Sequence, residues 1–106
     1  MIITNTQDVP GKEVTEVLEV VTGNTIRAKH VGKDIMSGFK QIVGGELKGY
    51  TDMLTEAREA AMKSMISEAQ KIGADAVVNV RFSTSAVMQG AAEILVYGTA
   101  VRLRSK

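Results

Sequence analysis

Cysteine is absent from the 106-residue sequence, which excludes disulfides, thiolate metal ligands and cysteine nucleophiles. Tryptophan is absent too, and two tyrosines and two phenylalanines are too few rings to form a platform for stacking nucleic-acid bases. The formal net charge is only +1, so the molecule has no overall basic field that would attract nucleic acid. We therefore expect no nucleic-acid partner.

Long apolar runs are also missing from the sequence. No segment approaches the roughly 20 apolar residues that a membrane-spanning helix needs, and the N-terminus lacks the basic and apolar regions of a signal peptide. An apolar content of 44% with 24% charged residues is typical of a soluble globular protein. We expect a single domain over residues 1–106, located in the cytoplasm and without a membrane partner.

The clearest pattern present is a long helix that leads directly into a strand. Thr51 is a suitable N-cap, Lys71 lies in the last turn, and Gly73 is suited to a left-handed C-terminal stop. Apolar residues spread over much more of the helix surface than the roughly 100° stripe that a surface helix needs. Either the helix is buried on two sides within the chain, or a second subunit covers part of it.

Several shorter elements surround this helix. A short strand is expected within residues 1–6, a turn at Pro10-Gly11, and a strand over residues 14–22 that returns through a Gly23-Asn24 hairpin. The polar residues of this strand do not all fall on the same alternating positions, so they cannot all lie on one face. This predicts a bulge or a position near a sheet edge. A short amphipathic helix is expected over residues 35–43, followed by a Gly44-Gly45 stop and a loop.

Two strands are predicted after the long helix, joined by a turn at residues 89–91. In the first, simple alternation places Ala76, Val78, Val80, Phe82 and Thr84 on one face. The second, over residues 93–103, is apolar in both phases and therefore needs cover on both faces. Two helices give too little cover for such a sheet, which again indicates a homo-oligomer.

A set of short motifs in this order resembles the YbjQ-like family, small bacterial and archaeal proteins often labelled "putative heavy-metal-binding". The residues that carry the resemblance span almost the whole chain: Val43-Gly44-Gly45, Tyr50, Glu56-Ala57-Arg58, Gly73 to Val78, and Tyr97 to Val101. The resemblance implies an α+β, dodecin-subunit-like fold. That fold has a small, mostly antiparallel sheet with one short and one long helix, and assembles as a pentameric β/α-propeller-like ring. It implies no defined activity.

Metal ligands are scarce in the sequence. His30 and Asp34 stand at i and i+4 and form a weak candidate pair, because a transition-metal site usually needs three or four such ligands. The simpler interpretation is an exposed pair at the start of a helix. A ring of such pairs between subunits would complete a coordination sphere.

Catalytic constellations are not recognisable. The serines have no histidine at a suggestive spacing, and the acidic residues are scattered singly. We therefore predict a homo-oligomeric binding or scaffold protein, not an enzyme and without a cofactor. The alternatives are a metal-ion-binding protein whose site forms at subunit interfaces, and an enzyme of unknown type with a cavity between subunits.

The predicted subunit interface centres on the long helix and the last strand. Arg58 falls within the apolar arc of the helix, where a charge must reach water or pair with a carboxylate such as Glu68, Asp34, Asp75 or Glu93. The candidate interface residues are Arg58, Glu68, Met62, Ile66 and Tyr97.

Overall fold

The computed structural model describes residues 1–28 and 45–106, which form one helix and four strands. The elements are β1 (Ile2–Ile3), β2 (Lys12–Ala28), α2 (Gly45–Lys71), β3 (Ala76–Met88) and β4 (Ala91–Ser105). The helix predicted over residues 35–43 and the candidate ligands His30 and Asp34 lie outside the described residues.

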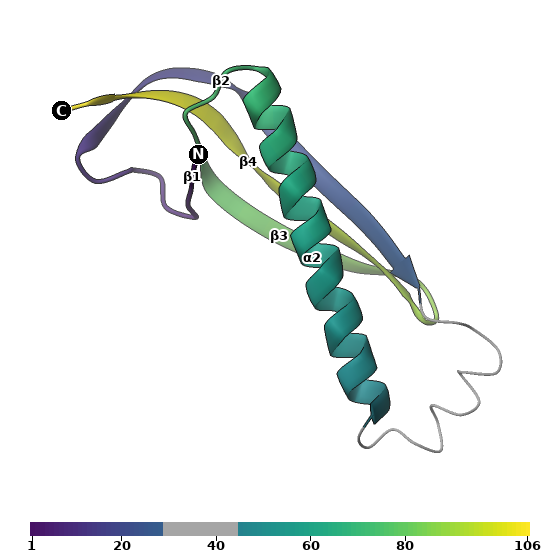
Figure 1. The fold of residues 1–106 in the computed structure, drawn as a ribbon. Helices are drawn as coiled ribbons and strands as arrows, with labels where there is room; N and C mark the ends of the chain where they lie inside the picture. The colour runs from purple at the N-terminus through teal and green to yellow at the C-terminus, as the bar shows by residue number, and fades with distance from the viewer. Residues whose placement is uncertain (29–44) are drawn as a thin grey trace.

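The strands form one mixed sheet in the order β1-β3-β4-β2. β4 pairs antiparallel with β2 on one side and β3 on the other, whereas the short β1 pairs in parallel with the start of β3. Helix α2 lies along one face of this sheet (Figure 1). The predicted α+β class and the mostly antiparallel sheet are confirmed.

Helix α2 ends where the sequence predicts but begins earlier. Gly73 has a φ of 78°, its N–H donates to Gln70 O, and the N–H of Ala74 donates to Ala69 O, which is the Schellman arrangement of a helix stop. The predicted N-cap at Thr51 and the loop before it are wrong, since the helix starts at Gly45. Glu46, Leu47 and Lys48 all have high helix propensity, and this outweighs the cost of Gly49.

Strand β2 is continuous from Lys12 to Ala28, so the predicted Gly23-Asn24 hairpin is wrong. Gly23 instead lies where the strand passes close to the helix: a Cβ there would overlap Ala61 O and lie 2.7 Å from Met65 N. The Gly-Asn pair, which is common in hairpin turns, serves helix–strand packing in this chain.

The irregularities predicted in the first half of β2 are confirmed. Its pairing with β4 shifts register between Val14 and Glu16 and again between Val17 and Glu19. β2 is also the edge strand on its side of the sheet, as the mixed polar pattern indicated.

Strand β3 changes phase at Asn79, which has a φ of 55° and lies at a register shift opposite β4. The simple alternation predicted for this strand is therefore wrong. Val77 and Val80 pack in the main core beneath the helix, whereas Ala76 and Val78 belong to a small cluster on the opposite face. An inserted residue in the left-handed region reverses which side chains face the helix.

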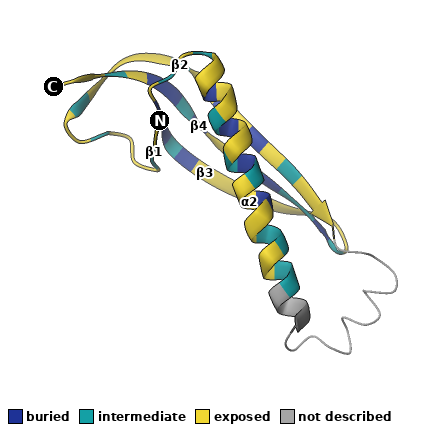
Figure 2. Ribbon diagram, viewed as in Figure 1, coloured by how far each residue is buried: buried dark blue, intermediate teal, exposed yellow. Residues whose placement is uncertain are grey.

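The main core lies between α2 and the sheet. Ala57, Ala61, Met65 and Ala69 recur every fourth residue and are fully buried, so the buried stripe of the helix is narrow and rich in alanine. Figure 2 shows this stripe facing the sheet while most of the helix surface is exposed. The polar residues of the opposite side of the helix are all exposed: Glu56, Glu59, Lys63, Ser67 and Gln70.

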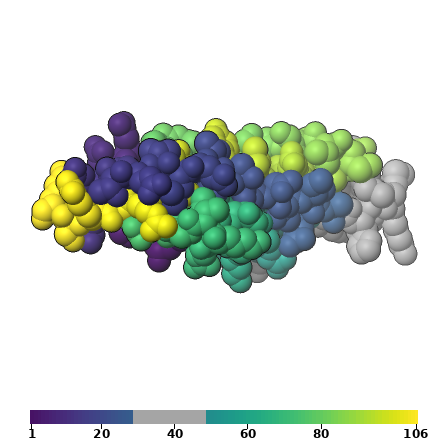
Figure 3. All heavy atoms as spheres, turned by 90° about the horizontal axis from the view of Figure 1, so that it is seen from above, coloured from purple at the N-terminus to yellow at the C-terminus, as the bar shows by residue number. Residues whose placement is uncertain are grey.

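A single chain of this shape is unusually extended (Figure 3). Its radius of gyration is 17.6 Å, whereas a compact domain of this length has about 13 Å. It exposes 6926 Å² of surface, against about 5,800 Å² for a compact monomer of the same mass. Both values are larger than those of a compact monomer of this length.

Candidate functional site

The face of the sheet turned away from α2, called here the far face, carries exposed apolar side chains. Residues paired across antiparallel strands point to the same face, and Val17, Val20 and Tyr97 belong to the same phase as buried Val101. The side chains of the edge strand are the most open: Val17 is 66% exposed, Val20 65% and Ile26 58%. Tyr97 on the neighbouring strand is 39% exposed.

Only one end of the far face is covered by the described chain. There Val9 and Leu103 pack on the small cluster of Ala76, Val78 and Val101. The backbone of the N-terminal segment is tied to β3 through Thr4 N to Val77 O at 3.0 Å and Asn79 N to Thr6 O at 3.0 Å. Beyond this cluster, the apolar residues of β2 remain open.

Arg58 and Glu68, the predicted charged interface residues, are both exposed on α2. The Arg58 guanidinium donates to the Thr55 hydroxyl at 3.2 Å, and Glu68 pairs with Lys71 at 3.3 Å. Two of the other carboxylates proposed for Arg58 have partners as well: Asp75 accepts from Leu103 N at 2.9 Å, and Glu93 accepts from Asn24 Nδ2 at 3.4 Å. Asp34 lies outside the described residues. Among the described residues, Arg58 is exposed and pairs with no carboxylate.

The three apolar interface candidates lie in different places. Met62 is partly buried and packs against the main core, and Ile66 is partly buried on the same helix. Tyr97 lies on the far face, on the other side of the sheet. The structure therefore divides the predicted interface set between two separate surfaces.

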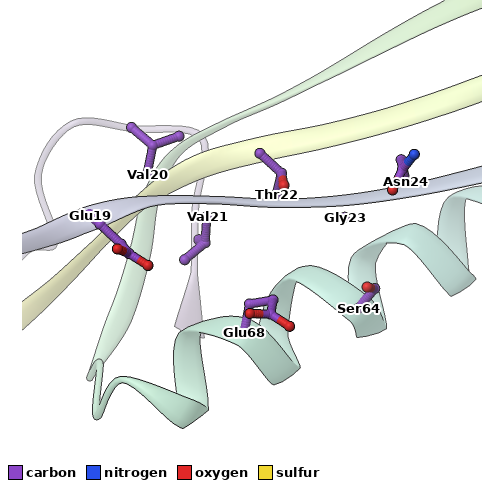
Figure 4. Close-up of a pocket in the computed structure, with 8 residues that line it drawn as sticks. All are labelled: Glu19, Val20, Val21, Thr22, Gly23, Asn24, Ser64 and Glu68. Atoms are coloured by element: carbon purple, nitrogen blue, oxygen red, sulfur yellow. The ribbon is translucent and has the colours of Figure 1, made fainter.

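A hollow of about 370 Å³ lies between residues 19–24 of β2 and helix α2. Figure 4 shows its two walls: Glu19 and Val21 of β2 point towards the helix, and Ser64 and Glu68 come from the helix itself. Val20, Thr22 and Asn24 point to the opposite side of the strand. The hollow is thus bounded by the backbone of an edge strand and by hydrogen-bonding side chains.

The groups around the hollow do not form a recognisable catalytic or metal site. The polar side chains that face it are the carboxylates of Glu19 and Glu68 and the hydroxyl of Ser64. Within residues 1–28 and 45–106, no three histidine, cysteine or acidic side chains gather closely enough to hold a metal ion. The same ranges contain no helix with the length and apolar composition needed to cross a membrane.

The hollow was not predicted from the sequence. The only local signal is Gly23, and the motif Gly23-Asn24 has a stronger alternative interpretation as a hairpin turn. A glycine within a run of β-branched residues also indicates a close backbone approach, and this is its role here.

Comparison with known proteins identifies relatives along almost the entire chain. Residues 1–104 match the model of the YbjQ family, which is described as "Putative heavy-metal-binding". A UPF0145 protein of Archaeoglobus fulgidus is 66% identical over 98% of this chain and 96% of its own length. One of Photobacterium profundum is 63% identical over 97% of this chain and 100% of its own length.

A solved structure shares the fold. A crystal structure from Pediococcus pentosaceus, of a DUF74-family protein with unknown function, aligns over 98% of both chains with a TM-score of 0.62. Its sequence identity to this chain is 16%, so the likeness concerns the fold alone.

Proposed function

The chain belongs to the YbjQ family, and from this membership and the uncovered far face we propose that it acts as a homo-oligomeric binding or scaffold protein without intrinsic catalysis. We place it in the cytoplasm, and the proposed ring is pentameric because the family resemblance implies five subunits. The sheet of each subunit would then be buried between its own helix and a neighbouring copy.

The observation that carries this proposal is the row of open apolar side chains on β2. Val17, Val20 and Ile26 are each more than half exposed, and they lie on one strand of a sheet whose other face is well packed. Several exposed apolar side chains on one face of a sheet are typical of protein–protein contacts.

The two surfaces that hold the predicted interface residues fit a head-to-tail arrangement. In such an arrangement each subunit presents one surface to the preceding copy and a different one to the next, and a suitable rotation closes a ring. Tyr97 on the far face and Arg58 on the helix would then serve different contacts.

Native mass spectrometry of the purified protein at micromolar concentration tests the proposal. We expect an oligomer whose contacts each bury more than about 1,000 Å². A single chain of 11.4 kDa under these conditions would contradict it.

The family description favours a second candidate, a metal-ion-binding protein whose site forms between subunits. It is tested on the same sample by measuring zinc, copper and nickel per subunit in the parent and in the His30→Ala variant. We expect substoichiometric metal in both, with equal uptake. Stoichiometric metal in the parent that is lost in the variant, with an affinity that falls as pH drops through about 6.5, would support the metal site instead.

A further inference from the structure

The sheet has two open edges that differ from one another. Among the described residues, β2 forms one edge along its length. β3 forms the other edge beyond Val80, where its backbone bonds to the N-terminal segment end. An open strand edge presents unpaired backbone N–H and C=O groups, which natural proteins usually protect with charged residues, proline or a covering segment.

Within residues 1–28 and 45–106, each edge has a run of seven consecutive residues without this protection. Val20 to Ile26 on β2 and Phe82 to Met88 on β3 contain neither a charged residue nor a proline. The rest of β2 is guarded, since Glu13 and Glu16 pair with Arg104 and Arg102 at 3.1 Å and 3.6 Å. The unguarded run on β3 ends in Val87 and Met88, which are 50% and 63% exposed.

The two unguarded runs lie at the same level of the sheet. Gly23 and Phe82 pair with the same residue of β4, Val96, and Asn24 and Ser83 both pair with Leu95. β2 and β3 also run in the same direction, because each is antiparallel to β4. A rotation about an axis roughly parallel to the strands would therefore bring the β3 edge of one copy beside the β2 edge of the next.

We propose that neighbouring subunits join by parallel pairing of residues 20–26 of β2 with residues 82–88 of β3 from a second copy of this chain. The hollow between β2 and α2 lies beside the receiving edge, so the helix leaves room for the incoming strand. Because the pairing uses two different edges, each subunit can bind one copy on either side, which adds subunits head to tail. The chain of subunits closes into a ring when the rotation between neighbours is a whole fraction of a full turn. This inference rests on the proposed homo-oligomer and adds a contact along the sheet edges to the proposed contact of the far face.

The absence of cysteine allows a clean cross-linking test. Thr22→Cys or Asn24→Cys on β2 is combined with Ser83→Cys or Ser85→Cys on β3, giving four double variants that allow for a shift of register. Within one subunit the two strands are separated by β4, hence by about 9–10 Å, which is too far for a disulfide. Paired strands of neighbouring subunits, about 4.8 Å apart, are within range.

We expect at least one double variant to form a ladder of covalent oligomers on mild oxidation, while each single variant stays unlinked. A matched control pairs Ser67→Cys, on the exposed side of α2, with Ser83→Cys and should give no ladder. Covalent dimers from Asn24→Cys alone would overturn the proposal in favour of β2–β2 pairing. An intact oligomer with no ladder from any of the four pairs would overturn the edge pairing alone, whereas a single chain by native mass spectrometry would overturn the oligomer as well.

Discussion

Gly23 of β2 lies directly against the backbone of Ala61 in α2, and this contact sets how closely the helix approaches the sheet. A Cβ at Gly23 would overlap Ala61 O, and the flanking helix residues that face the sheet are mostly alanines with no exposed surface. Small residues on both partners allow the two backbones to come together at this point.

Gly23→Ala should destabilise the subunit strongly. The atoms that the new methyl group meets belong to the helix backbone, so no side-chain rotation relieves the overlap. We expect a loss of at least about 3 kcal/mol in the free energy of unfolding, at the upper end for overpacked cores. Urea unfolding followed by circular dichroism measures this loss. Gly11→Ala is the control, because nothing lies within 4 Å and only its φ of 78° is unfavourable, which costs about 1–2 kcal/mol. Equal midpoints for the Gly23 variant and the parent would contradict the proposed packing role.

Asn79 should tolerate glycine but not valine. Its φ of 55° lies in the left-handed region, where asparagine and glycine are accommodated and β-branched residues are strained. We expect Asn79→Val to lose about 1–2 kcal/mol of unfolding free energy and Asn79→Gly to change it by a few tenths. Thermal unfolding of the two variants beside the parent provides the comparison. A valine variant as stable as the parent would show that β3 can pair without this bulge.

Val20→Glu should impair assembly while leaving the subunit folded. Val20 is 65% exposed in the single chain, so the substitution removes little intrachain packing. It places a charge on the far face, where a neighbouring copy would have to desolvate it. We expect native mass spectrometry to show dissociated subunits with an unchanged circular dichroism spectrum. Ser67→Glu, on the exposed side of α2, is the control and should remain assembled. An intact oligomer from the Val20 variant would remove this part of the far face from the interface.

Arg58→Ala should have a small effect on the subunit itself. The guanidinium is exposed and donates to Thr55, and such exposed interactions contribute under about 1 kcal/mol. We expect the unfolding free energy to fall by less than that amount at protein concentrations where subunits are dissociated. The denaturation is repeated at a higher protein concentration, where subunits are associated. A larger loss of unfolding free energy at that concentration would indicate that Arg58 contacts another subunit.

The sequence predicted the elements whose signals are local. Gly73 ends helix α2 with a φ of 78°, as its motif indicated. Gly90 has a φ of 79° and lies in the predicted turn between β3 and β4. The irregular polar pattern at the start of β2 also predicted its bulges and its edge position. In each case the structure depends on residues close together in the chain.

The incorrect predictions concern features that depend on distant residues. Gly23-Asn24 has the composition of a hairpin turn, and only the position of Ala61 shows that Gly23 is needed for packing. The phase of β3 depends on one residue, Asn79, whose conformation alternation cannot reveal. The hollow beside β2 likewise arises from two elements about 45 residues apart, so no sequence motif marks it.

The pairing of β2 with β4 determines when this protein can fold during its synthesis. Hydrogen bonds between these strands join residues far apart in the chain, such as Asn24 with Glu93 at a separation of 69 and Thr15 with Arg102 at 87. β2 leaves the ribosome early, but it has no partner in the sheet until β4 has been made. The β3–β4 hairpin and helix α2 can form locally, whereas β2 must wait for the last strand and then close a long loop. The sheet can therefore be completed only after β4 has been synthesised.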